Sequence, residues 1–141
     1  NPLLKEISAK DEYLEVAVVR DVLSSCNEID PSIFDFPKSQ RLKELNEIYF
    51  EGIVQAAIGE REGVARKPAP DMVKTALEEL GKSADTAVYI GDSDVDVMTA
   101  KNSGLPCISV LWGFRDKEFL IEHGATHFAE KPEDIVKFLE Q

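Results

Sequence analysis

Three aspartates follow a predicted strand at every second position of the chain. Asp92, Asp94 and Asp96 come after Gly91, and residues 86–90 before them have the β-branched and aromatic bias of a buried strand. In open α/β sheets ligands bind outside the carboxyl ends of the strands, and Mg2+ needs only one or two protein carboxylates beside phosphate and water. The spacing therefore indicates a cation site. Because unpaired carboxylates this close would repel one another, we also expect a positive group nearby.

The acidic cluster has a plainer alternative interpretation. An acidic run after a strand can be a solvated turn in which Asp94 caps the next helix. The choice depends on what else the chain brings to the same edge of the sheet.

Lys67 is the candidate cation. It lies in the run Arg66-Lys67-Pro68-Ala69-Pro70-Asp71, where two prolines fix φ on either side of Ala69 and stiffen the loop. Asp92 follows 92 − 67 = 25 residues later, so one intervening helix would bring both side chains to the same sheet edge. A lysine placed there could neutralise a phosphoryl group and the carboxylates around it. The alternative is an exposed surface lysine beside a helix start.

Predicted strands and helices alternate along most of the chain. Helices of about ten residues between strands favour βαβ units, so the predicted fold class is α/β, a Rossmann-like parallel sheet flanked by helices. The apolar run at 16–19 fits either a short buried strand or the middle of a helix. We predict helices at 39–51, 71–80, 94–103, 116–123 and 132–140, and strands at 53–58, 86–90, 107–111 and 126–129.

The composition limits the class of protein. A chain of 141 residues, 43% of them hydrophobic, suits one domain with a core, and its net charge of -11 argues against nucleic acid as a partner. Cys26 and Cys107 fit neither a disulfide framework nor a metal-binding spacing, which favours a cytoplasmic location. No apolar run reaches the roughly 18 residues of a membrane span, so we expect no membrane association.

Several motifs together resemble a known family. Residues 59–71, the run Tyr89-Ile90-Gly91-Asp92-Ser93-Asp94-Val95-Asp96, and residues 110–115 are similar to the carboxyl-terminal half of phosphoglycolate phosphatases, which belong to the haloacid dehalogenase superfamily. The resemblance covers about residues 39–139. It divides the chain into an atypical segment, 1–38, and the carboxyl-terminal half of a haloacid dehalogenase-like core, 39–141, for which an incomplete core is one possibility and no clear cap is found.

The resemblance implies roles for particular residues. By likeness, Lys67 binds the phosphate and orients the nucleophile, Asp92 is a catalytic Mg2+ ligand, and Asp96 is the second acid that supports or shares the ion. The implied partner is a small phosphorylated metabolite, a phosphate monoester like phosphoglycolate. The family also places the loop 112–114 near the active-site face, although its Trp and Phe fit packing better than substrate contact.

One part of the family pattern has no counterpart. The family's nucleophile and general acid/base lie in an Asp-x-Asp-Gly-Thr motif, but the Asp-x-Asp pairs here are Asp92/Asp94 and Asp94/Asp96. Without the nucleophile, the aspartyl-phosphate intermediate cannot form. Asp35, in Ile33-Phe34-Asp35-Phe36-Pro37, is open to three interpretations: the nucleophile, a carboxylate at the family's Ser/Thr phosphate-binding position, or a structural residue.

Two main hypotheses follow. The first is a Mg2+-dependent phosphatase, or a truncated or altered form of one. The second is a non-catalytic α/β domain that retains a weak cation or phosphate site or acts as an interaction module. A dehalogenase is a weaker third option, since that reaction needs no Mg2+ and the acid-rich motif argues for a metal. The identity of the ester and the oligomeric state stay open.

Overall fold

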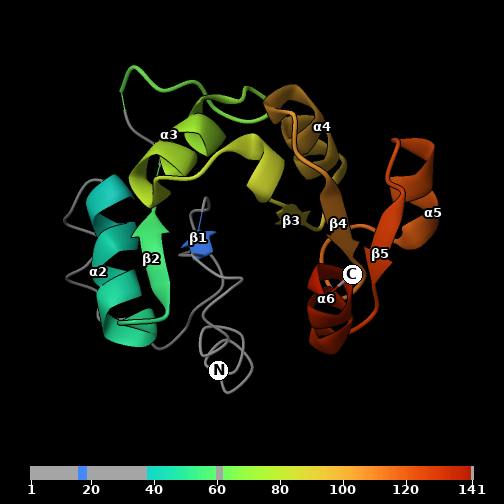
Figure 1. Cartoon of the computed structure of the whole chain (residues 1–141). Helices are drawn as coiled ribbons and strands as arrows, with labels where there is room; N and C mark the ends of the chain where they lie inside the picture. The colour runs from blue at the N-terminus through green and yellow to red at the C-terminus, as the bar shows by residue number, and fades with distance from the viewer. Residues whose placement is uncertain (1–15, 19–37, 60–61, 141) are drawn as a thin grey trace.

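The computed structural model describes residues 16–18, 38–59 and 62–140 (Figure 1). Within these residues, helices alternate with strands as the sequence predicts. The elements are β1 (Val16–Val18), α2 (Lys38–Phe50), β2 (Val54–Ala57), α3 (Asp71–Leu80), a 3-10 turn (Ala84–Thr86), β3 (Tyr89–Gly91), α4 (Asp94–Ser103), β4 (Cys107–Val110), α5 (Lys117–Glu122), β5 (His127–Ala129) and α6 (Pro132–Leu139).

The strands form two parallel sheets. β3, β4 and β5 pair in that order, with Tyr89 opposite Cys107 and Ile108 opposite His127, while β1 pairs with β2. Parallel pairing follows from the helix between successive strands, which returns the chain to the same end of the sheet. The predicted α/β class with a parallel sheet is confirmed, and Val16–Val18 is a strand rather than part of a helix.

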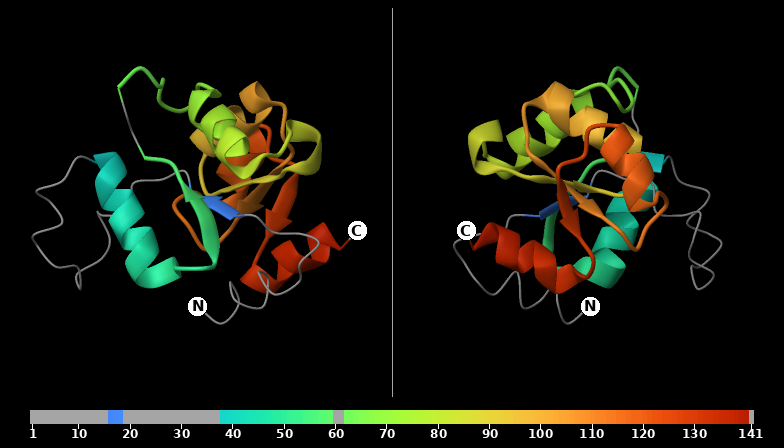
Figure 2. Two further views of the ribbon diagram at one scale, coloured as in Figure 1. Left: turned by 60° about the vertical axis from the view of Figure 1, so that its left-hand side comes forward. Right: turned by 90° about the vertical axis from the view of Figure 1, so that its right-hand side faces the viewer.

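Helices cover both faces of the three-stranded sheet. Along β4, Ile108 and Val110 pack against Ile135 of α6, whereas Cys107 packs on the opposite side with residues of α3, α4 and α5. This alternation is the period of two that a strand buried on both faces requires. Figure 2 shows α4 and α6 on opposite sides of these strands.

α3 connects the two sheets. Met72 and Ala76 pack with Ala56 and Ile58 of the β2 segment, while Val73 packs with Tyr89 of β3 and with α4. Gly81 ends the helix at φ 64°, in the left-handed conformation predicted for it. The helix that follows the Lys67 loop therefore belongs to both cores, which fixes that loop beside β3.

The strand predicted at 86–90 starts later than expected. Residues 84–86 form a 3-10 turn in which Thr86 Oγ1 and the Thr86 amide both donate to the Ser83 carbonyl, at 3.1 and 3.2 Å. Local side-chain hydrogen bonds of this kind compete with sheet pairing. Ile90 was also expected to be buried but is 45% exposed, whereas Tyr89 is the buried residue of β3.

Two further expectations concern the division of the chain into segments and the absence of a membrane-spanning helix. The division at residue 38 stays a prediction, although β1 of the first segment pairs with β2 of the second. Among the residues that the structure describes, no helix is both long and apolar enough to cross a membrane.

Candidate functional site

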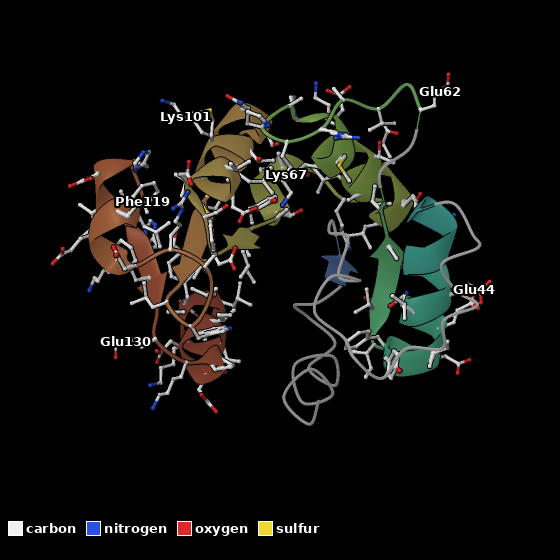
Figure 3. All side chains as sticks on the ribbon, turned by 180° about the vertical axis from the view of Figure 1, so that it is seen from behind. Glu44, Glu62, Lys67, Lys101, Phe119 and Glu130 are labelled. Atoms are coloured by element: carbon white, nitrogen blue, oxygen red, sulfur yellow. The ribbon has the colours of Figure 1, made fainter. Side chains whose placement is uncertain are left out.

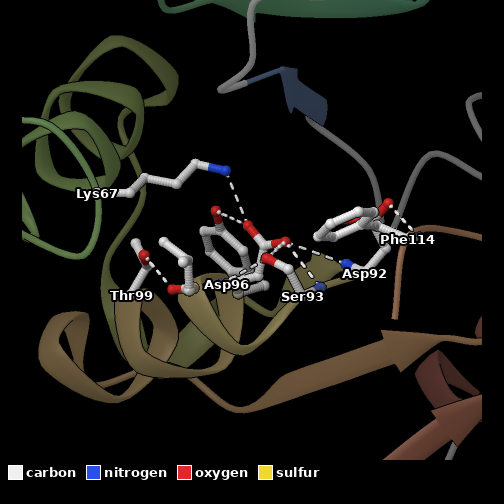
Figure 4. A network of polar contacts seen from close by, with 8 residues as sticks. Lys67, Asp92, Ser93, Asp96, Thr99 and Phe114 are labelled. Atoms are coloured by element: carbon white, nitrogen blue, oxygen red, sulfur yellow. Dashed lines mark hydrogen bonds and ion pairs between the residues drawn. The ribbon is translucent and has the colours of Figure 1, made fainter. Parts of the chain in front are cut away.

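Lys67 and Asp96 meet at the carboxyl end of β3. The Lys67 Nζ atom lies 2.8 Å from Asp96 Oδ1, and the lysine side chain is 26% exposed (Figures 3 and 4). The ammonium also lies 5.8 Å from the centroid of the Tyr89 ring. The sequence prediction that a positioned lysine would approach the acidic turn is confirmed, and the interpretation of Lys67 as a solvated surface residue is wrong.

Asp96 is the centre of a closed hydrogen-bond network. Its Oδ1 accepts from Lys67 and, at 3.0 Å, from the Tyr89 hydroxyl. Its Oδ2 accepts from the Asp92 amide at 3.1 Å, the Ser93 amide at 3.2 Å and the Ser93 hydroxyl at 2.9 Å. The residue is 6% exposed. A buried carboxylate is stable here because each oxygen has its partners.

The β3–α4 turn explains how Asp96 reaches this position. Ser93 is the N-cap of α4: its Oγ accepts from the Asp96 amide at 3.3 Å, and Asp96 returns to the Ser93 amide, which forms a capping box. The interpretation in which Asp94 caps the helix is therefore wrong, because Asp94 is the first helical residue. Position 91 requires glycine because the Asp96 side chain lies against its backbone: a Cβ there would lie 2.2 Å from Asp96 Cβ.

The electrostatics of Asp96 have two opposing causes. Burial by itself would raise the pKa of this carboxyl, but the hydrogen bond and charge of Lys67, with the bonds from Ser93 and the Asp92 amide, outweigh burial and lower the pKa below its usual value. Asp96 is thus an anion at neutral pH. The positive group expected near the acids is Lys67, beside Asp96. The structure adds a second one, Arg115, whose Nε lies 3.5 Å from Asp94 Oδ1.

Asp92 is held differently, by the backbone of the β4–α5 loop (residues 111–116). The Phe114 amide donates to Asp92 Oδ2 at 3.1 Å, and the Arg115 amide donates to the Asp92 carbonyl at 3.1 Å. A Cβ on Gly113 would lie 2.3 Å from Asp92 Cβ, so only glycine lets the loop come this close. Within the described residues, Asp92 Oδ1 accepts no hydrogen bond.

The β4–α5 loop lies beside the site, as the resemblance implied. Its aromatic side chains do not pack into the core, contrary to the expectation: Trp112 is 50% and Phe114 71% exposed. The Arg115 guanidinium lies between two rings, 4.4 Å from the Phe114 centroid and 4.3 Å from the Phe119 centroid. The loop thus contributes main-chain donors to Asp92 and apolar surface to its surroundings.

One oxygen of the Asp92 carboxylate has no hydrogen-bond partner among the described residues and is a candidate ligand for a divalent ion. Over residues 16–18, 38–59 and 62–140, no group of three His, Cys, Asp or Glu side chains lies close enough together to form a metal cage. Mg2+ does not require one, since it is commonly held by one or two carboxylates with waters and phosphate oxygens. The Asp92 carboxylate, with one oxygen unused, fits such an ion, whereas Asp96 would first have to give up an existing partner.

The sequence also singled out Asp35, Cys26 and Cys107. Asp35 and Cys26 lie outside the described residues. Cys107 is a free thiol on β4, and burial raises its pKa to about 11, so it is a packing residue and not a nucleophile. The role of Tyr89 is not among the sequence predictions, although a buried tyrosine hydroxyl needs a partner and could have been suspected on that ground.

The chain has relatives among known proteins. A phosphoglycolate phosphatase of Xanthomonas campestris pv. campestris is 38% identical over 50 residues, 36% of this chain and 23% of the relative. A "putative pyrophosphatase PpaX" of Caldanaerobacter subterraneus subsp. tengcongensis is 27% identical over 138 residues, 96% of this chain and 56% of the relative.

The solved structures agree with the sequence relatives. A "putative phosphoglycolate phosphatase" from Lactobacillus delbrueckii subsp. bulgaricus superimposes with a TM-score of 0.79 at 36% identity, covering 98% of this chain and 51% of that one. The chain therefore spans about half the length of this structural relative. The HAD-hydrolase-like family model matches residues 64–141, more than half of the chain's length and a range that includes Lys67, Asp92 and Asp96. The chain belongs to the HAD-like hydrolase family.

Proposed function

We propose that this chain is, or forms part of, a Mg2+-dependent phosphatase that hydrolyses a small phosphate monoester resembling phosphoglycolate. One observation carries the proposal: the Lys67 ammonium contacts Asp96 Oδ1 at 2.8 Å while the Asp92 amide contacts the other oxygen of the same carboxylate at 3.1 Å. Asp96 thereby ties the cation and the first acid of the turn into one unit. Such a unit suits a phosphoryl group, whose charge needs both a lysine and a metal.

The names of the relatives support phosphate chemistry. They include a phosphoglycolate phosphatase and a "putative pyrophosphatase", whose substrates by name are small phosphorylated molecules. Because the chain covers 23% and 56% of these two proteins, activity and substrate are transferred here as part of the proposal. A cytoplasmic setting is proposed with them.

Each site residue has a distinct proposed role. Lys67 binds the phosphoryl oxygens through its ammonium, and Asp92 holds Mg2+ through the carboxylate oxygen that the β4–α5 loop leaves unused. When bound, Mg2+ supplies charge neutralisation at the phosphate oxygens. Direct coordination by Asp96 stays a prediction. Its contacts support a role in fixing Lys67 and the β3–α4 turn.

The covalent step needs a further carboxylate. No Asp-x-Asp-Gly-Thr motif occurs in these 141 residues, so the attacking group is either a carboxylate outside that motif, with Asp35 as one candidate, or is not supplied by this sequence. The lack of this motif in the sequence also supports the second hypothesis, a non-catalytic domain that retains a cation or phosphate site.

The test is hydrolysis of p-nitrophenyl phosphate and 2-phosphoglycolate with and without Mg2+. We expect Mg2+-dependent turnover that falls about 100-fold or more in Asp92→Asn and in Lys67→Ala, because each substitution removes charge stabilisation of the transition state. Asp94→Asn, in the same turn, is the matched control and should keep most of the activity. Turnover that Asp92→Asn leaves unchanged would refute the metal role. Absence of turnover, with a Mg2+-induced rise in Tm that needs Asp92, would favour the non-catalytic domain.

A further inference from the structure

A residue of α4 outside the acidic turn contacts the backbone of the Lys67 loop. Asn102 Nδ2 donates to the Pro68 carbonyl at 2.8 Å, across 34 residues of sequence. We propose that Asn102 is a positioning residue, which holds the loop so that the Lys67 ammonium stays at Asp96. Its relevance to phosphate binding rests on the proposed function, whereas the positioning itself does not.

The loop is attached to α4 at both ends of the helix. Asp96, in the first turn, binds the Lys67 side chain, and Asn102, in the last turn, binds the carbonyl of the next residue. Six residues separate the two attachment points, which is about 9 Å along a helix axis. Two contacts this far apart fix both the position and the direction of the lysine side chain between them, which one contact cannot do.

The local sequence leaves the loop dependent on outside donors and acceptors. Pro68 and Pro70 have no amide hydrogen to give, and the Ala69 amide is used within the loop, donating to the Arg66 carbonyl at 3.0 Å. Proline fixes φ inside the loop, but it does not fix how the loop lies on the rest of the protein. The Asn102 amide supplies that external restraint at the residue adjoining Lys67.

The contact is poorly explained as a stabiliser of the helix. Asn is a weak helix former, and alanine at an exposed helical position is better. Asn102 is exposed, so Asn102→Ala removes the bond to Pro68 while improving the intrinsic preference of α4 for its own conformation. These opposing effects should leave Tm close to that of the parent protein, so that a change at Lys67 can be measured without a change in folding.

The experiment measures the position of Lys67 without any turnover. The parent, Asn102→Ala and Lys101→Ala are treated with an acetylating reagent for amines, and the labelling rate of each lysine is followed by mass spectrometry. Lys101 lies in the same turn of α4 and projects away from Lys67, so its substitution is the matched control (Figure 3). In the parent, the contact with Asp96 should slow labelling of Lys67 relative to exposed lysines such as Lys74.

We expect the labelling rate of Lys67 to rise about fivefold in Asn102→Ala, the change in population that loss of one net hydrogen bond produces. Lys74 should label at an unchanged rate, and Lys101→Ala should leave Lys67 unchanged. An equal rate at Lys67 in all three proteins would overturn the proposal. A rise at every lysine together with a lower Tm would also overturn it, because that result is general loosening.

A second arm uses inorganic phosphate as the probe and separates this inference from the proposed function. Protection of Lys67 by phosphate in the parent, weakened in Asn102→Ala, would support both. A faster Lys67 in Asn102→Ala with no protection by phosphate in any protein would support the positioning role and count against phosphate binding by Lys67.

Discussion

Asp96 and Asp92 both follow β3, yet their carboxylates are held by different regions of the molecule, the β3–α4 turn and the β4–α5 loop. In the β3–α4 turn the contacts come from side chains: Asp96 is buried, and its carboxylate accepts hydrogen bonds from the side chains of Lys67, Tyr89 and Ser93. In the β4–α5 loop, the backbone makes the contact, since the amide of Phe114 binds Asp92 while the Phe114 ring stays exposed. Side-chain identity therefore matters in the first turn, and backbone path in the second.

The difference separates two roles that the sequence presents as equal. Both carboxylate oxygens of Asp96 accept hydrogen bonds from the protein, so its negative charge stabilises the β3–α4 turn and the position of Lys67. Asp92 has one oxygen fixed by the loop and one with no partner among the described residues, so its charge can act on a ligand. Acids four residues apart thus form an internal anchor, Asp96, and the carboxylate that we propose binds the ion, Asp92.

The largest predicted effect follows from removing the anchor. Asp96→Ala removes the carboxylate to which the Lys67 ammonium and the Tyr89 hydroxyl donate, and should lower the free energy of unfolding by about 2–4 kcal/mol. Asp94→Ala, its control, loses an ion pair in which both side chains are partly exposed, 30% for Asp94 and 38% for Arg115, and should cost about 0–1 kcal/mol after screening by solvent. Urea unfolding of both variants measures the two changes in the free energy of unfolding. Equal changes in the two variants would contradict the role of Asp96 as an anchor.

The two close-approach glycines extend the comparison. Gly91→Ala puts a Cβ 2.2 Å from Asp96 Cβ, and because this site is backbone-rigid it should cost about 1–3 kcal/mol of stability. Gly113→Ala puts a Cβ 2.3 Å from Asp92 Cβ, but Gly113 lies in an exposed loop. Gly113→Ala should therefore lower the free energy of unfolding less than Gly91→Ala does, and should weaken Mg2+ binding more. Urea unfolding and Mg2+ titration calorimetry rank the two variants, and the reverse order on either measure would count against the assignment.

The sequence predicts well what depends on neighbouring residues. The helix at 94–103 was predicted at its observed bounds, because Asp94 begins it and Gly104, at φ 73°, ends it. The lysine and acidic motifs were placed at one sheet edge by counting a single intervening helix. Local spacing and chain connectivity were enough for both.

What the sequence does not predict is which groups of the turns and loops meet around the site. The contacts of Tyr89 with Asp96, Asn102 with Pro68 and Phe114 with Asp92 all require knowing which side chain faces which loop. The expected burial of Ile90, which is 45% exposed, was wrong as well. Periodicity gives the face of a strand but not what covers it.

A smaller effect is expected on acidification. The pKa of Asp96 in the folded protein lies below its ordinary value of 3.8, so its contribution to stability is complete above that value and is lost as pH falls through the folded pKa. In Asp96→Asn the side chain is an amide, which has no carboxyl group to take up a proton in this pH range. The stability difference between parent and Asp96→Asn should therefore narrow as pH is lowered below 3.8, measured by urea unfolding at several pH values. A difference that stays constant through this range would show that Asp96 is not held as an anion.

The smallest effect is expected where a side chain is changed but the backbone contact remains. Phe114→Ala removes a ring that is 71% exposed and contacts Arg115 at 4.4 Å, a contact worth about 0.5–1 kcal/mol at an exposed site, and Phe119 retains the guanidinium at 4.3 Å. Because the Phe114 amide and not its ring binds Asp92, Mg2+ affinity should be unchanged.

Trp112 provides the readout for this last variant. It is the one tryptophan of the chain, half-exposed and two residues from Phe114, so its fluorescence reports on the β4–α5 loop. Mg2+ should change the emission equally in the parent and in Phe114→Ala. Phe114→Pro lacks the amide hydrogen and should lose that response, even where its Tm stays close to that of the parent. A response lost in Phe114→Ala and kept in Phe114→Pro would mean that the ring, rather than the backbone, connects this loop to Asp92.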